Sequence, residues 1–174
     1  MGKGSKARHV NGIISAVIVV FFLVHAALGS IESTPSSESP IRWVIWAGVC
    51  LVGVHVLTSI VTSYQQMTDK EFPPSARKKR HLVLKWVTGV LLASAVFVHV
   101  SNVQATGAGE AVPPEALAAA TVVLAAVLAW HIFVGVKSML TDVGLSKGLM
   151  TPLRVIVIVL AVVFAISAIA AVVL

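Results

Sequence analysis

Five long runs of apolar residues dominate this chain, and their length limits what it can fold into. They lie near Gly12–Ser30, Trp43–Ser63, Leu82–Gln104, Ala116–Ser138 and Pro152–Leu174. A helix needs about 20 residues to cross the roughly 30 Å of hydrocarbon in a bilayer, and each run is close to that length. Of the 174 residues, 57% are hydrophobic and 11% charged, which is too apolar for a water-soluble domain. We therefore expect an all-α membrane protein, one domain over residues 1–174 with five transmembrane helices.

The basic residues indicate which helix ends share one side of the membrane. Twelve of the 13 Lys and Arg residues lie before the first run, between the second and third runs or between the fourth and fifth, if Lys85, Lys137 and Arg154 at the adjoining run ends are included; only Arg42 does not. Loops rich in Lys and Arg face the cytoplasm. This pattern predicts a cytoplasmic N-terminus and an outer C-terminus, in a prokaryotic cytoplasmic membrane. The net charge of +6 does not indicate nucleic-acid binding, because the basic residues lie at membrane edges and not along a soluble face.

Four histidines lie singly in the first four runs: His25, His55, His99 and His131. An ionisable side chain in hydrocarbon is costly and marks a functional site by default. Helix direction puts His25 and His99 toward the outer side, and His55 and His131 toward the cytoplasm, at levels on the order of 15 Å apart. Neutral imidazole is a good iron ligand, and two axial histidines leave no open position on the iron. The two pairs therefore predict two bis-histidine haem b sites, with the first four helices forming the haem-binding bundle.

Other chemistry is possible for these histidines. A site with two metal ions in a helix bundle usually recruits carboxylates, and no Asp or Glu lies inside the predicted spans. Ordinary hydrogen bonds between helices remain the simpler alternative for each histidine taken alone.

Small and basic residues near the histidines are candidates for contact with haem. Gly29 and Gly135 each follow a histidine by four residues, and Gly48 precedes one by seven, so each glycine shares a helix face with its histidine. Glycines also serve ordinary helix–helix contact in membranes, which leaves their role open. The haem propionates need cationic or hydrogen-bonding partners. The candidates are Arg80, Lys85 and Lys137 on the inner side and Arg42 on the outer side.

Two stretches resemble a known family. Trp86–Val100, WVTGVLLASAVFVHV, and Trp130–Gly148, WHIFVGVKSMLTDVGLSKG, are similar to the dihaem cytochrome b subunit of succinate:quinone and quinol:fumarate oxidoreductases, of the five-helix type. The resemblance implies that the first and third histidines bind the outer haem, and the second and fourth the inner one. It also implies a quinone substrate, menaquinone or ubiquinone, and two partners on the cytoplasmic face, an iron–sulfur subunit and a flavoprotein subunit.

The chain departs from this family at two positions. Lys85 stands where the family commonly has Gln, and Ala129 stands where some members have a Glu associated with proton movement. The quinone site and proton coupling therefore stay open.

Two features of the sequence indicate that the site reacting with the dicarboxylate, succinate or fumarate, lies on another chain. The single cysteine, Cys50, cannot hold an iron–sulfur cluster, and no dinucleotide fingerprint occurs. We therefore expect no catalytic residue here, and a docking surface for partners on the basic loops Lys70–Arg80 and Lys137–Lys147. Two alternatives remain. One is a cytochrome-b561-like transmembrane electron carrier, which normally has a sixth helix; the other is a haem-free structural membrane anchor or small transporter.

Overall fold

The computed structural model describes the backbone of residues 3–29 and 41–173, and side chains within residues 6–25, 43 and 46–170. The described residues form five α-helices and no strands. Each helix is long and apolar enough to cross a membrane, so the prediction of an all-helical, multi-pass membrane protein is confirmed. The helices are α1 (Lys3–Gly29), α2 (Ile41–Met67), α3 (Ala76–Gly107), α4 (Pro114–Val143) and α5 (Lys147–Val173).

The helices extend beyond the apolar runs that predicted them. Helical hydrogen bonding continues through polar residues outside the hydrocarbon until a capping residue stops it. The Ser75 hydroxyl accepts a hydrogen bond from the Lys78 main-chain N–H at 3.3 Å and begins α3. Gly144, with φ of 88°, ends α4 in the left-handed conformation that glycine adopts freely. Asp142 consequently lies in the last turn of α4, whereas the apolar run had left it in a loop.

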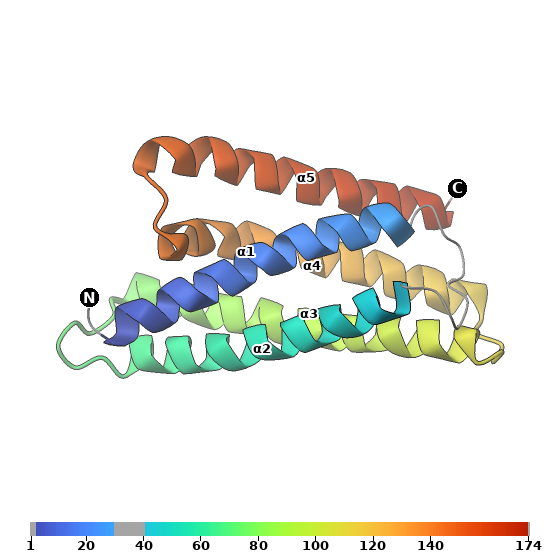
Figure 1. The fold of residues 1–174 in the computed structure, drawn as a ribbon, viewed down its shortest axis with the longest axis horizontal. Helices are drawn as coiled ribbons and strands as arrows, with labels where there is room; N and C mark the ends of the chain where they lie inside the picture. Colours follow the sequence, from blue (N-terminus) through green and yellow to red (C-terminus); the bar gives the residue numbers. More distant parts are fainter. Residues whose placement is uncertain (1–2, 30–40, 174) are drawn as a thin grey trace.

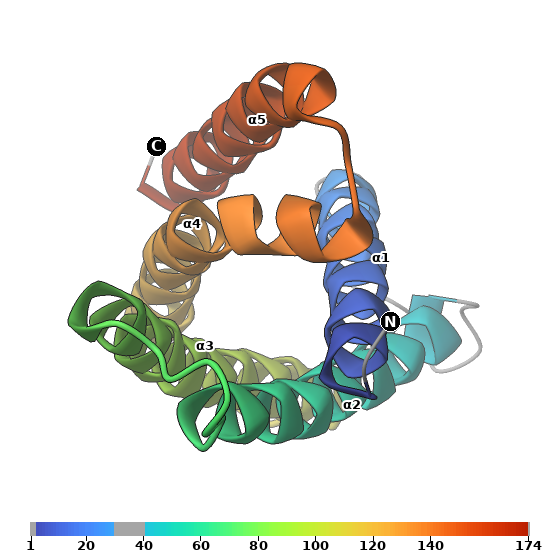
Figure 2. The ribbon, with the colours of Figure 1, turned by 90° about the vertical axis from the view of Figure 1, so that its left-hand side faces the viewer.

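Four helices form a ring and the fifth lies outside it (Figures 1 and 2). Around the ring, α1 packs against α2 and α4, and α3 packs against α4, whereas α2 and α3 barely touch. Helix α5 packs mainly on the outer face of α4, as expected for a helix with almost no polar side chains. The ring is therefore closed on three sides and loosely closed on the fourth, between α2 and α3.

Side-chain burial is inverted relative to a water-soluble protein. Large apolar side chains such as Phe97 and Leu57 are 74% and 65% exposed, where lipid would cover them. The most deeply buried side chain of the described residues is polar: Thr88 is 0% exposed. Asn11 and Thr62 are buried as well. Buried polar groups in a membrane bundle need partners within the protein, and the hydroxyls of Thr88 and Thr62 donate to main-chain oxygens of their own helices.

The apolar core lies between α4 and α5. Its buried members are Ile132, Val136 and Leu140 of α4 and Ala161 of α5, and partly buried apolar side chains surround them. This interface holds α5 against the ring without contributing to the ring's interior.

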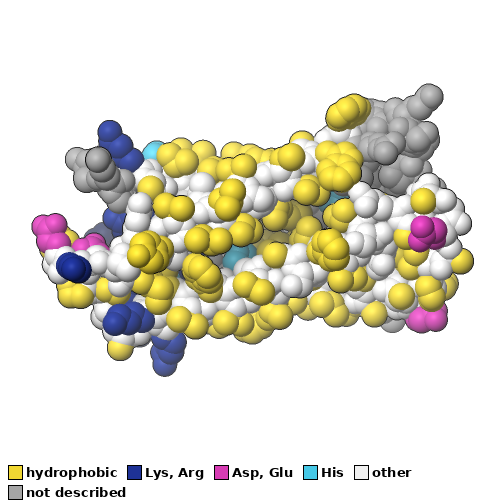
Figure 3. Space-filling view, turned by 90° about the horizontal axis from the view of Figure 1, so that it is seen from below, with side chains coloured by type: hydrophobic (Ala, Val, Ile, Leu, Met, Phe, Trp, Pro, Cys, Tyr) yellow, Lys and Arg dark blue, Asp and Glu magenta, His cyan; other side chains and the backbone are white. Residues whose placement is uncertain are grey.

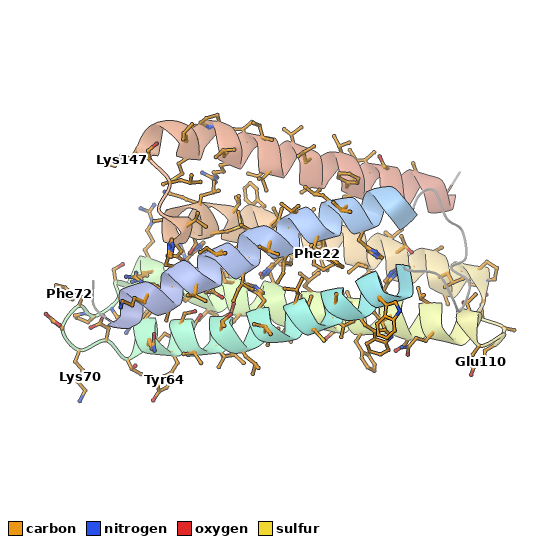
Figure 4. All side chains as sticks on the ribbon, viewed as in Figure 1. Phe22, Tyr64, Lys70, Phe72, Glu110 and Lys147 are labelled. Carbon is orange, nitrogen blue, oxygen red and sulfur yellow. The ribbon has the colours of Figure 1, made fainter. Side chains whose placement is uncertain are left out.

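Basic side chains gather at one end of the bundle. Figure 3 shows Lys and Arg side chains at the end where the chain begins, and Figure 4 shows Lys70 and Lys147 at that end and Glu110 at the opposite one. The three basic segments of the sequence therefore meet at one membrane edge, as the loop pattern predicts. That this edge is cytoplasmic remains a prediction from the charge rule.

The start of α1 fits tightly against the end of α4. His9 Nδ1 donates to the Asp142 main-chain oxygen at 3.0 Å, which satisfies one of the unpaired carbonyls at the helix end. A Cβ on Gly12 would lie 2.9 Å from both the Asp142 Cβ and the Val143 main-chain nitrogen. Only glycine therefore allows this approach of the two helices.

We expect Gly12→Ala to lower the free energy of unfolding by about 1–3 kcal/mol, because a methyl group would overlap main-chain atoms that cannot move independently. The measurement is the apparent melting temperature of the purified protein in detergent. Gly53→Ala is the matched control, because no atom lies within 4 Å of a Cβ built on Gly53. An equal change of melting temperature in the two variants would contradict the prediction that the contact at Gly12 excludes a methyl group.

Candidate functional site

The four histidines of the first four helices form two pairs inside the ring. His25 of α1 and His99 of α3 lie close enough to interact electrostatically, and so do His55 of α2 and His131 of α4. The members of each pair come from helices on opposite sides of the ring (Figure 2). The structure thus brings together the same residues that helix direction pairs by depth. Ligation of iron by them stays a prediction.

The loosely closed side of the ring gives these histidines open space. Figure 3 shows a long hollow on the face formed by α2 and α3, with histidine side chains visible inside it. Helices α2 and α3 barely touch, and the side chains between them leave the hollow seen in Figure 3. A flat macrocycle would need such room between two imidazoles.

His55 belongs to a network of polar side chains from α1 and α2. The Ser15 hydroxyl donates to the Asn11 main-chain oxygen at 2.7 Å and lies 3.3 Å from His55 Nδ1. Asn11 Oδ1 accepts from Thr58 Oγ1 at 2.9 Å and from Ser59 Oγ at 3.2 Å. A hydroxyl has one proton to donate. Because Ser15 gives its proton to Asn11, its oxygen is left to accept from the Nδ1–H of His55.

His131 is held in the same way by α3. The buried Thr88 hydroxyl donates to the main-chain oxygens of Leu84 and Lys85 at 3.0 and 3.1 Å, and lies 2.9 Å from His131 Nδ1. The hydroxyl oxygen therefore accepts from Nδ1–H. The next residue, Gly89, brings the α3 backbone beside the imidazole of His131, since a Cβ on Gly89 would lie 3.5 Å from His131 Cε1.

The hydroxyls of Ser15 and Thr88 favour the same tautomer of His55 and His131, with the proton on Nδ1. With the proton on Nδ1, the lone pair of each imidazole lies on Nε2, and Ser59 Oγ lies 3.5 Å from Nε2 of His55. Histidines that bind metal through one nitrogen almost always donate the other ring N–H to a fixed acceptor. In this tautomer each inner imidazole would offer its neutral Nε2 as a ligand.

The outer pair has a different environment. The hydrogen bonds of the described residues involve neither His25 nor His99. The ring of Phe21 stacks on His25, with centroids 6.2 Å apart and planes 7° from parallel. Gly48 of α2 is buried against Phe21, because a methyl group on it would overlap the phenyl ring. Gly48 therefore acts through Phe21, which it allows to pack beside His25.

Lys85 lies inside the bundle beside the inner pair. Its Nζ donates to Ser138 Oγ at 3.2 Å, and Ser138 Oγ in turn lies 3.5 Å from Asp142 Oδ2. Its charge acts on both His55 and His131. Of the predicted partners for haem propionates whose side chains the structure describes, Lys85 is the one whose charge acts on both inner histidines.

The remaining candidates lie elsewhere or beyond the described side chains. Arg80 is exposed, and Lys137 is exposed and lines a cavity between α4 and α5. No atom lies within 4 Å of a Cβ built on Gly135, so this glycine faces open space one turn from His131. The surroundings of Gly29 and the side chain of Arg42 lie outside the described residues.

Clusters of three or more His, Cys, Asp or Glu do not occur among the described residues; each bis-histidine site uses two. No family model, curated protein or solved structure matches the chain. The resemblance to the dihaem cytochrome b subunits therefore rests on the four histidines and the two stretches of α3 and α4.

Sequence reasoning missed the hydroxyl partners of the inner histidines. Thr88 and Gly89 belong to the stretch Trp86–Val100 that contains His99, but the structure places them against His131 of α4. Asn11 directly precedes the first apolar run and Ser15 lies within it, and the sequence interpretation gives neither residue a role. The available signal was that Asn11 and Ser15 are four residues apart, hence on one helix face, and that polar side chains in a membrane span need partners.

Proposed function

We propose that this chain is a membrane-anchor cytochrome b that carries electrons between quinone or quinol and a cytoplasmic iron–sulfur and flavin partner, of the succinate dehydrogenase or fumarate reductase type. It would hold two haems b, the outer one by His25 and His99 and the inner one by His55 and His131. The observation that carries the proposal is the pairing of these four histidines across the ring, with both inner rings held through Nδ1.

The residues of the site are suited to electron transfer. A bound haem b supplies a reversible one-electron change at its iron. Two imidazoles from opposite sides of the ring would hold each haem and would leave its iron no open position for oxygen or water. The hydroxyls of Ser15 and Thr88 fix the orientation of the inner imidazoles, and the Lys85 ammonium offers a cation for a propionate. The apolar outer faces of the helices insulate the site from water.

The proposed partners would dock at the basic end of the bundle. Lys70 lies exposed in the loop before α3, Lys147 lies exposed at the first residue of α5, and Arg80 lies exposed in the first turns of α3. The chain has one cysteine, which cannot hold an iron–sulfur cluster. Electrons arriving at the inner haem would therefore pass to a cluster on another chain bound at this end.

The first experiment is a reduced-minus-oxidised absorption spectrum of the purified protein with quantification of extracted haem. We expect a b-type spectrum, about two haems per chain, and reduction by a quinol analogue. Co-purification from native membranes should recover an iron–sulfur protein and a flavoprotein. A colourless protein would support the haem-free anchor instead. Two haems without those partners would favour the cytochrome-b561-like carrier.

A further inference from the structure

A cavity of about 310 Å³ lies between α4 and α5, close to the basic end of the bundle. Its lining combines two cations and a hydroxyl with three apolar side chains: Lys137, Arg154, Thr151, Met150, Val155 and Ile158. It is separate from the histidine sites, because α5 lies outside the ring (Figure 2).

The guanidinium in this cavity has an unmet hydrogen-bonding requirement. Arg154 Nε is buried and has no acceptor among the described residues. Leaving a charged donor buried without a partner is costly, so an acceptor is expected to enter from outside the chain. No Asp or Glu lines the cavity. The nearest acid along the chain, Asp142, instead interacts with Lys85, Arg8 and Lys78.

We propose that this cavity binds the phosphate group of an anionic phospholipid from the leaflet at the basic end. Phosphate oxygens accept hydrogen bonds from guanidinium and ammonium groups, and basic pockets between membrane helices at this edge suit anionic headgroups. The apolar residues Met150, Val155 and Ile158 share the same lining. They would contact an acyl chain, which free phosphate lacks. The lipid would contact both α4 and α5, and its binding would not depend on haem.

The test is native mass spectrometry of the full chain after reconstitution with phosphatidylglycerol, phosphatidylcholine, or phosphatidylcholine plus inorganic phosphate. We expect one retained phosphatidylglycerol per chain and little retained phosphatidylcholine. Arg154→Gln should weaken phosphatidylglycerol binding about tenfold, and Lys137→Gln about fivefold, since each removes one charge from the headgroup. Lys6→Gln is the control, because Lys6 is an exposed cation on α1.

The outcomes separate the sources of phosphate. Equal retention of phosphatidylglycerol by wild type and by both variants would overturn the proposal, and so would equal retention of the two lipids by wild type. Inorganic phosphate that binds as tightly as phosphatidylglycerol would overturn the assignment to lipid. Lys137 is exposed, so its variant keeps the test decisive even where Arg154→Gln fails to fold.

Discussion

Alanine in place of His131 is expected to lower the haem content of the purified protein from about two haems b per chain to about one. His55→Ala should give the same loss, because each inner imidazole supplies one of two axial ligands and the interaction of His131 with His55 places both at one site. The measurements are the amount of haem extracted per chain and a redox titration of the haem absorbance. The titration should lose one component and retain the other.

Double variants test the pairing itself. His55→Ala combined with His131→Ala should lose no more haem than either single change, since both remove ligands of the same site. His25→Ala combined with His131→Ala should lose both haems, because His25 is paired with His99 at the other site. Additivity between sites and redundancy within a site is the signature of two independent bis-histidine centres.

His81→Ala serves as the control, because His81 is exposed at the start of α3 and should leave the haem content unchanged. If His25→Ala and His55→Ala proved redundant with each other, the pairing across the ring would be wrong. If the wild type and all four single variants carried no haem, the whole electron-carrier proposal would fail.

The number of helices, their order and the depth of the four histidines follow from the sequence alone. Apolar runs of sufficient length can only be satisfied as membrane helices, because the backbone must bond internally in hydrocarbon. Antiparallel neighbours then place His25 and His99 in one half of the bilayer and His55 and His131 in the other. The structure brings the same pairs together.

The contacts around the inner histidines could not be predicted in the same way. They depend on how each helix is rotated about its axis, and a helix that is apolar on all faces carries little rotational signal. Thr88 is eleven residues before His99 on one helix, yet its hydroxyl meets His131 on the next. The loose packing of α2 on α3 likewise depends on helix tilt. Asp142 came within reach of Lys85 because α4 continues past its apolar run.

Replacing Thr88 with valine is expected to weaken binding of the inner haem alone, by about 10- to 100-fold. Valine has nearly the shape of threonine but cannot accept a hydrogen bond, so the His131 Nδ1–H would lose its acceptor at 2.9 Å. The imidazole would then be free to change tautomer or turn, and its Nε2 would become a poorer ligand. Retention of haem during dilution and the midpoint potential of each haem are the measurements.

Matched variants separate positioning of His131 from a general effect on the helix. Thr88→Ser keeps the hydroxyl and should restore most of the affinity and the potential. Thr121→Val makes the same change at an α4 hydroxyl that donates only to the Leu117 main-chain oxygen at 2.9 Å, and it should leave both haems as in wild type. A Thr88→Val protein with unchanged potentials, or with both potentials shifted alike, would show that Thr88 does not act through His131. A shift confined to one haem, rescued by serine, would instead mean that a hydroxyl on α3 orients the ligand contributed by α4.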